Sequence, residues 1–298
     1  MHIRIAHSSV YRYDPPAAGV IQVLRLTPRN HEGQYVLDWR IDVTRDALLA
    51  AHEDAFGNIT HVFTADGPFS ELSVEVDGQV ETQNTDGVVR GAVERFPPSL
   101  FLRDTALTQA DTAIREFGEK IRAVSGGEVL AELHALLDRL YEDMSHENMG
   151  HENVSHENVS HENGGHKNGG HENVGHNADS SHTATTAAQA FALRRGGSRD
   201  LTHIFIAVAH SLGIPARYVG GYFRRPDNSV AQHAGHAWAE AYVSDLGWVG
   251  FDPTNGFCPT DAHVRIAIGL DSLGAAPVRG TRLGAGTETL AVAIKVGQ

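Results

Sequence analysis

The amino-acid sequence predicts an α+β protein in which an N-terminal antiparallel β domain precedes a core of helices packed on a second antiparallel sheet. Two observations predict this class. Residues 1–95 contain short alternating or β-branched runs, which turn signals such as DPPAAG, FGN, DGP and NTDG separate. Beyond them, apolar residues first recur at helical spacing and then return to strand-like runs. At 298 residues the chain is long enough for two domains with separate cores.

Five runs in the first part have the pattern of strands: HIRIAHSSVYRY, VIQVLRLTPR, YVLDWRIDVT, ITHVFTA and ELSVEVDGQVET. We expect them to form a small antiparallel sandwich or barrel over residues 1–95. The proline-marked stretch RFPPSLFLRDT then opens a linker and helical segment, 96–144, which leads into the core.

Helical spacing predicts helices over about 109–124, 127–144 and 187–194. A fourth helix follows Ser198 and ends at Gly213, with a proline shortly after it. Three strands are then expected in ARYVGGYF, GHAWAEAYV and GWVGFDP, and VRIAIG and TLAVAIKV are expected to add two more. We therefore place the core domain at 183–298.

Composition limits the possible functions. The net charge of −13 argues against nucleic-acid binding and against attraction to anionic membranes. Apolar runs stay shorter than the roughly 20 residues of a membrane helix, and the first residues lack the pattern of a signal peptide. A single cysteine, Cys258, excludes an internal disulfide. We expect a cytoplasmic protein with no cofactor.

A histidine-rich tandem repeat interrupts the chain between the two predicted helical regions. The stretch SHENMGHENVSHENVSHENGGHKNGGHENVGHN places a histidine at every fifth position and carries almost no apolar residues. Such a chain buries too little surface to offset the entropy of ordering it, so we expect a disordered insertion over 145–182. A five-residue period builds no preformed ligand set on a helix or a strand, so we expect no metal site; weak metal capture is the alternative.

A possible catalytic group emerges from three separate segments. In HAWAEAYV, His236 shares one strand face with Trp238 and Glu240, while alanines occupy the other. If the loop to the next strand has three or five residues, His236 and Asp252 project to the same side; four residues would separate them. Ser198 begins a helix, where free backbone N–H groups favour an anion, behind two glycines that leave room for substrate.

The same segments resemble a known family. The blocks GGSRDLTH, LGIPARYVGGY, HAWAE and GWVGFDPTN occur in the order found in bacterial transglutaminase-like proteins, a branch of the papain-like cysteine acyl-transfer superfamily. YRYDPP, LRLTPR and DAFGN are similar to the β domain that precedes the core in these proteins. The resemblance implies acyl transfer at peptide or protein amides, with Ser198, His236 and Asp252 as the catalytic residues.

The chain departs from the family at one position, because the nucleophilic cysteine falls at Ser198. A cysteine thiol beside an imidazolium ionises near neutral pH, whereas a serine hydroxyl must lose its proton during the attack. We therefore expect impaired or absent catalysis. The alternatives are a serine-dependent amide hydrolase, a natural or engineered change in an active lineage, a binding module that uses the retained cleft, and a metal-associated protein acting through its repeat. Oligomeric state is not set by the sequence.

Overall fold

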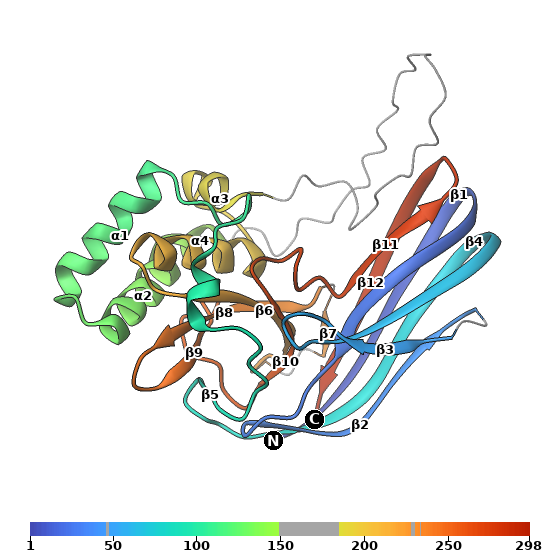
Figure 1. The fold of residues 1–298 in the computed structure, drawn as a ribbon, viewed down its shortest axis with the longest axis horizontal. Coiled ribbons are helices and arrows are strands. Elements are labelled where there is room, and N and C mark those ends of the chain that lie inside the picture. Colours follow the sequence, from blue (N-terminus) through green and yellow to red (C-terminus); the bar gives the residue numbers. More distant parts are fainter. Residues whose placement is uncertain (46–47, 149–184, 228–229, 233) are drawn as a thin grey trace, which may run out of the picture.

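The computed structural model describes residues 1–45, 48–148, 185–227, 230–232 and 234–298. These residues form two antiparallel sheets, with the helices gathered beside the smaller one (Figure 1). The predicted α+β class is therefore confirmed.

The larger sheet consists mainly of N-terminal strands. Its seven strands follow the order β2-β4-β1-β12-β7, with β11 paired to β1 and β3 paired to β4. The strands are β1 (His2–Thr27), β2 (Gln34–Val43), β3 (Ala50–Glu53), β4 (Ile59–Thr82), β7 (Ala231–Gln232), β11 (Val278–Leu283) and β12 (Thr287–Gly297).

Two strand boundaries predicted from turn signals were wrong. DPPAAG lies inside β1 and DGP lies inside β4, so each of these elements joins two predicted strands. The two segments lie opposite each other, since Ala17 pairs with Phe69 and Gly19 with Asp66, with register shifts on either side of Ala17. Because both strands shift register together, the ladder passes through the turn-type residues instead of reversing.

A second correction concerns the C-terminus. We expected TLAVAIKV to join the core sheet, but it forms β12, which pairs with β1 from Asp14↔Thr287 to Arg4↔Gly297. The preceding β11 also pairs with β1. The last twenty or so residues thus return to the first sheet (Figure 1). Alternating patterning predicted the strand itself, but gave no information about its partner.

The smaller sheet carries the candidate site. Its order is β10-β6-β8-β9-β5. The strands are β5 (Val88–Val89), β6 (Ala216–Phe223), β8 (His236–Val243), β9 (Gly247–Phe251) and β10 (His263–Gly269). The helices are α1 (Thr112–Ser125), α2 (Val129–Asn148), α3 (Ala187–Leu193) and α4 (Ser198–Ser211), with a 3₁₀ helix, η1 (Pro98–Leu102). As expected, VRIAIG lies in this sheet, within β10.

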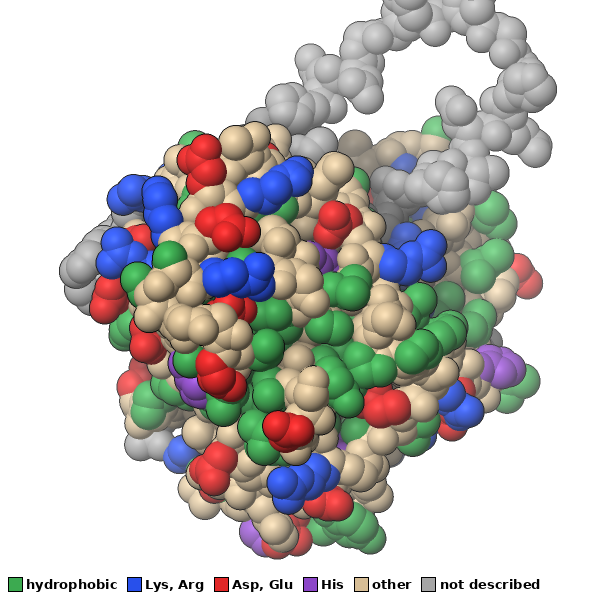
Figure 2. All heavy atoms as spheres, turned by 60° about the vertical axis from the view of Figure 1, so that its left-hand side comes forward, with side chains coloured by type: hydrophobic (Ala, Val, Ile, Leu, Met, Phe, Trp, Pro, Cys, Tyr) green, Lys and Arg blue, Asp and Glu red, His purple; other side chains and the backbone are tan. Residues whose placement is uncertain are grey.

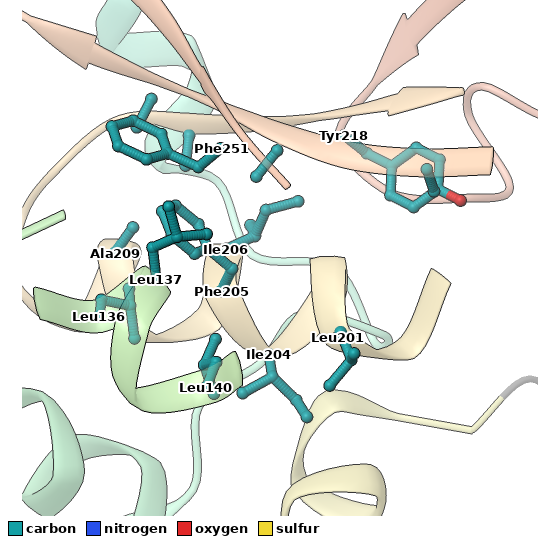
Figure 3. Packing of buried hydrophobic residues seen from close by; sticks show 14 of the residues in the cluster. Leu136, Leu137, Leu140, Leu201, Ile204, Phe205, Ile206, Ala209, Tyr218 and Phe251 are labelled. Carbon is teal, nitrogen blue, oxygen red and sulfur yellow. The ribbon is translucent and has the colours of Figure 1, made fainter. Parts of the chain in front are cut away.

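Helix α4 is the centre of the core. Every residue from Leu201 to Ala209 is buried, so the helix is enclosed by other elements on all sides. Figure 3 shows it between α2, which contributes Leu136, Leu137 and Leu140, and the sheet, which contributes Phe251. Phe205 stacks on Phe251 with ring centroids 5.2 Å apart. This packing fixes α4 firmly against the sheet, and with it the position of Ser198.

The outer surface is mixed in character. On the face shown in Figure 2, acidic and basic side chains are interspersed around a central group of hydrophobic side chains.

The histidine-rich insertion predicted at 145–182 lies outside the described residues, apart from its first four residues, which belong to α2. The proposed boundaries of the four segments stay a prediction.

Candidate active site

The start of α4 is shaped by two glycines and an aspartate. Asp200 Oδ2 accepts a hydrogen bond from the backbone N–H of Gly197 at 3.0 Å, which caps the helix. A Cβ at Gly196 would lie 2.5 Å from Asp200 Cβ, so no side chain fits there, whereas Gly197 faces open space. Ser198, the first helical residue, is half-buried. The backbone directly before Ser198 is thus left uncovered at Gly197.

Two contacts fix the direction of α4 along the sheet. The His203 ring lies 5.3 Å from the ring of Tyr218, which pairs with Ala239 of β8. Further along the helix, His210 Nε2 lies 3.1 Å from the carbonyl oxygen of Ala216, two residues earlier on β6. Because β6 and β8 are antiparallel, earlier on β6 means later on β8. Helix α4 and strand β8 therefore run in the same direction.

This direction brings Ser198 to the end of the sheet where His236 lies. Ser198 precedes His203 by five residues, which is roughly 7.5 Å of helix. The same length spans between two and three residues of strand, at about 3.3 Å each. Counting back from the level of Ala239 on β8 reaches the first residues of that strand, which begins at His236.

The hairpin between β8 and β9 has the register that aligns the other two residues. Val243 pairs with Gly247, so the connecting loop has three residues, and Glu240 pairs with Gly250. Even-numbered positions therefore lie opposite even-numbered positions. His236 and Asp252 project to the same side, as the three-residue alternative predicted.

His236 and Asp252 are hydrogen-bonded. His236 Nε2 lies 2.6 Å from Asp252 Oδ2, and the carboxylate is fully buried. Since Asp252 accepts the proton carried by Nε2, Nδ1 of the neutral ring keeps its lone pair and can accept a proton. The contact that the sequence left dependent on the loop length is therefore present, although it says nothing by itself about the use of the pair.

Asp252 is held as a carboxylate by several donors. Asn255 Nδ2 donates to Oδ2 at 2.7 Å, and the backbone N–H groups of Thr254 and Asn255 donate to Oδ1 at 3.1 and 3.3 Å. Burial alone would raise the pKa of Asp252, but the adjacent His236 and His263 rings outweigh it and hold that pKa well below its usual range. The aspartate is thus ionised throughout the ordinary pH range.

Sequence reasoning missed one residue of this cluster. His263, the first residue of β10, lies with Nε2 3.1 Å from Asp252 Oδ2, the same oxygen that His236 contacts. Its side chain is buried. The only signal in the sequence was a histidine just before the predicted strand VRIAIG, and nothing indicated that this strand would begin beside Asp252.

Ser198, the third of the proposed catalytic residues, is less closely joined to the other two. Helix α4 packs in the cluster that contains the alanine face of β8, while His236 shares the opposite face with Trp238. Within the described residues, no hydrogen bond connects the Ser198 hydroxyl to His236. The two side chains can meet only beyond the N-terminal end of β8, which begins at His236. Their convergence stays a prediction.

Cys258 lies in a different part of the core. It lines a cavity of about 440 Å³ together with Val88, His134 and Val249, among other residues. Burial, followed by the nearby charges of Asp86 and Asp138, raises the pKa of the Cys258 thiol to about 11. This environment is the opposite of one that activates a cysteine, which agrees with reading Cys258 as an incidental thiol.

One cluster in the described part of the chain has the composition of a metal site. His236, Asp252 and His263 offer ligand-type atoms that all lie within 4.8 Å of one another. Both imidazole Nε2 atoms, however, point at the same carboxylate oxygen. A cation would have to displace both hydrogen bonds and both protons, so the arrangement fits a hydrogen-bonded cluster better than a ligand set.

Known proteins share both halves of this architecture. Residues 3–81 match the bacterial transglutaminase-like N-terminal region, and residues 166–253 match the transglutaminase-like superfamily. The chain has a transglutaminase-like core behind a bacterial transglutaminase-like N-terminal region. The resemblance inferred from the four sequence blocks is thereby confirmed at the level of the family. In the described residues, no helix is long and apolar enough to cross a membrane.

Relatives of similar length occur in mycobacteria. "Uncharacterized protein ML0607" of Mycobacterium leprae is 25% identical over 308 residues, covering 99% of this chain and 98% of that protein. "Uncharacterized protein Rv2569c" of Mycobacterium tuberculosis is 23% identical, covering 93% and 86%. A solved structure from Cytophaga hutchinsonii, named as a candidate cysteine protease, superposes with a TM-score of 0.67 at 20% identity, covering 100% of this chain and 90% of that one. This last likeness concerns the fold.

Proposed function

We propose that this transglutaminase-like protein binds peptide or protein amides at the end of β8 and is a weak or inactive acyl-transfer catalyst. The observation that carries the proposal is the 2.6 Å hydrogen bond between His236 Nε2 and the buried, ionised Asp252. It orients the imidazole and leaves Nδ1 as the proton acceptor. The level of Ser198 along β8 and the open space beside Gly197 support a substrate site there.

In the proposed reaction the Ser198 oxygen bonds to the amide carbonyl carbon while its proton passes to His236 Nδ1. The carbonyl oxygen becomes an anion near the backbone N–H groups at the start of α4. When the tetrahedral intermediate collapses, the C–N bond breaks and His236 returns the proton to the departing amine. Water or a second amine then releases the acyl group by the same steps in reverse.

The serine is the reason to expect slow chemistry. In a site built for a thiolate, the imidazolium and the helix N-terminus stabilise an anion that a hydroxyl does not form. Oxygen is also smaller than sulfur, and a misplacement near 1 Å is enough to lose about 100-fold in rate.

The decisive experiment restores the thiol. Ser198→Cys in the full chain is treated with iodoacetamide at pH 7, and the adduct is located by mass spectrometry. We expect alkylation at position 198 at least about tenfold faster than in the matched double variant Ser198→Cys with His236→Gln, which lacks the imidazolium partner. Equal, slow labelling of both variants would overturn the proposed site.

A second measurement separates weak catalysis from a working serine enzyme. Wild-type protein is incubated with a fluorophosphonate probe, which forms an adduct with activated serines. We expect no adduct at Ser198 under conditions that label an ordinary serine hydrolase. A stoichiometric adduct at Ser198 that disappears in His236→Gln would instead establish a serine-dependent amide hydrolase.

A further inference from the structure

Two histidines share one oxygen of Asp252. His236 Nε2 lies 2.6 Å from Oδ2 and His263 Nε2 lies 3.1 Å from the same atom. His236 comes from β8 and His263 from β10, and β6 lies between these strands. A carboxylate oxygen that accepts from two imidazoles has its negative charge divided between them.

The hydrogen bonds of His263 define where its proton lies. The backbone N–H of Thr260 donates to Nδ1 at 3.1 Å, so Nδ1 carries a lone pair and no proton. The proton of the neutral ring is therefore on Nε2, where it is donated to Asp252. Burial lowers the pKa of His263 and outweighs the opposing effect of Asp252. Burial therefore keeps the ring neutral. His263 is thus a fixed neutral donor.

The surroundings of the two rings are mostly aromatic. Phe223 lies 4.6 Å from the His263 ring and 5.2 Å from the His236 ring, and Trp238 meets the edge of His263 at 5.3 Å. Asn255 Nδ2 is the additional polar group near His236, at 3.4 Å from Nε2. Within the described residues, Asp252 is the one charged side chain that forms a hydrogen bond or ion pair with either ring.

We propose that His263 is a positioning residue that acts on His236 through Asp252. By donating to the oxygen that holds His236, it withdraws charge from that oxygen and limits how strongly Asp252 favours the protonated form of His236. The Nδ1 lone pair of His236 is the acceptor that the proposed reaction uses. The inference rests on the proposed role of His236 as the proton acceptor.

The N-terminal region holds His263 in place. Strand β10 is the outer strand of its sheet, yet two side-chain amides cover its free edge. Gln34 accepts from the N–H of Arg265 at 2.8 Å and donates to its carbonyl at 3.0 Å. Asn58 does the same at Ile268, with both bonds at 2.8 Å. Each amide pairs with β10 as another strand would, so the N-terminal sheet contributes to the position of His263.

The test is a titration of His236 by NMR in the full chain, which needs neither substrate nor catalysis. In His263→Phe the ring shape is kept but the donor is lost, so the pH at which His236 loses its charge should rise by about 0.5 to 1 unit. In His263→Gln the amide nitrogen can still donate to Asp252, and the midpoint should stay within about 0.2 units of wild type. Glutamine keeps both donor and acceptor atoms in its amide group, whereas phenylalanine has neither, so the two variants differ in hydrogen bonding at this position.

Several outcomes would overturn the inference. An unmoved or lowered midpoint in His263→Phe would do so, as would equal shifts in the two variants. If circular dichroism shows that His263→Phe is unfolded, His263→Leu takes its place in the comparison. Nitrogen-15 shifts of wild-type His263 must also show the proton on Nε2; a proton on Nδ1 contradicts the inference without any variant.

The experiment distinguishes this inference from the proposed function. Fast alkylation of Ser198→Cys combined with an unmoved His236 midpoint would overturn the role of His263 and leave the acyl-transfer site standing. Slow alkylation combined with a raised midpoint would show that His263 tunes His236 although Ser198 does not meet it.

Discussion

Arg217 and Glu240 lie directly opposite each other on β6 and β8, with Arg217 Nε 2.7 Å from Glu240 Oε2 and both side chains fully buried. Arg265 donates to both oxygens of Glu240, at 2.7 and 3.0 Å. Arg217 also forms two bonds to Glu94 and lies 3.9 Å from the Trp248 ring centre. The arginine of LGIPARY and the glutamate of HAWAE are thus structural partners.

Removing the Glu240 charge should be costly, because it leaves buried guanidinium groups without their shared carboxylate. We expect Glu240→Gln to lower the free energy of unfolding by about 3–5 kcal/mol. The control is Glu71→Gln, which breaks the exposed pair with Arg12 and should cost less than about 1 kcal/mol. Urea unfolding followed by tryptophan fluorescence measures both. Similar losses in the two variants would show that the buried network contributes little.

The same network predicts a pH dependence of stability. Burial would raise the pKa of Glu240, but Arg265 and Arg217 lower it from 4.5 to about 2. A carboxyl whose pKa is lower in the folded state stabilises the protein above its unfolded value and loses that effect as the pH falls. The stability difference between wild type and Glu240→Gln should be complete above about pH 5.5 and shrink toward pH 2. A difference that stays constant across this range would contradict the assignment.

The sequence predicted the local elements of the core better than their partners. Helical periodicity placed α4 correctly, because Leu201, Ile204 and Phe205 recur on one face and Gly213 ends the segment with a positive φ of 76°. The strand TLAVAIKV was also found, but its pairing with β1 depends on contacts almost 300 residues apart. Periodicity carries no information about such distant partners.

The residues of the candidate site also differ in how far the sequence could predict their positions. His236 and Asp252 could be predicted because one short hairpin joins their strands, and the strand period decides which side chains share a face. His263 could not, because β10 reaches Asp252 through its pairing with β6 and through amides of the N-terminal region. Ser198 could be placed at a helix start from its glycines, but its approach to His236 depends on how α4 packs.

Cys258 offers a test of the electrostatics that needs no substitution. Because burial raises the pKa of its thiol to about 11, the thiolate is scarce at neutral pH. We expect the rate of iodoacetamide labelling in wild type to rise about tenfold per unit between pH 7 and pH 10. Mass spectrometry at each pH gives the rate. A plateau below pH 9 would show that the thiol ionises more easily than its surroundings imply.

The bonds from the Gln34 and Asn58 side chains to the outer edge of β10 should be visible in hydrogen exchange. Gln34→Leu removes both bonds to Arg265 while keeping similar bulk, so the Arg265 N–H loses its acceptor. We expect a loss of about 1–3 kcal/mol in the free energy of unfolding and at least about tenfold faster exchange of the Arg265 amide. Asn58→Leu should produce the same effect at Ile268 instead. Each variant serves as the control for the other, since a local clamp predicts that fast exchange follows the substituted amide. Equal acceleration of every β10 amide in both variants, with no excess at the amide whose acceptor was removed, would contradict a local role for the two side chains.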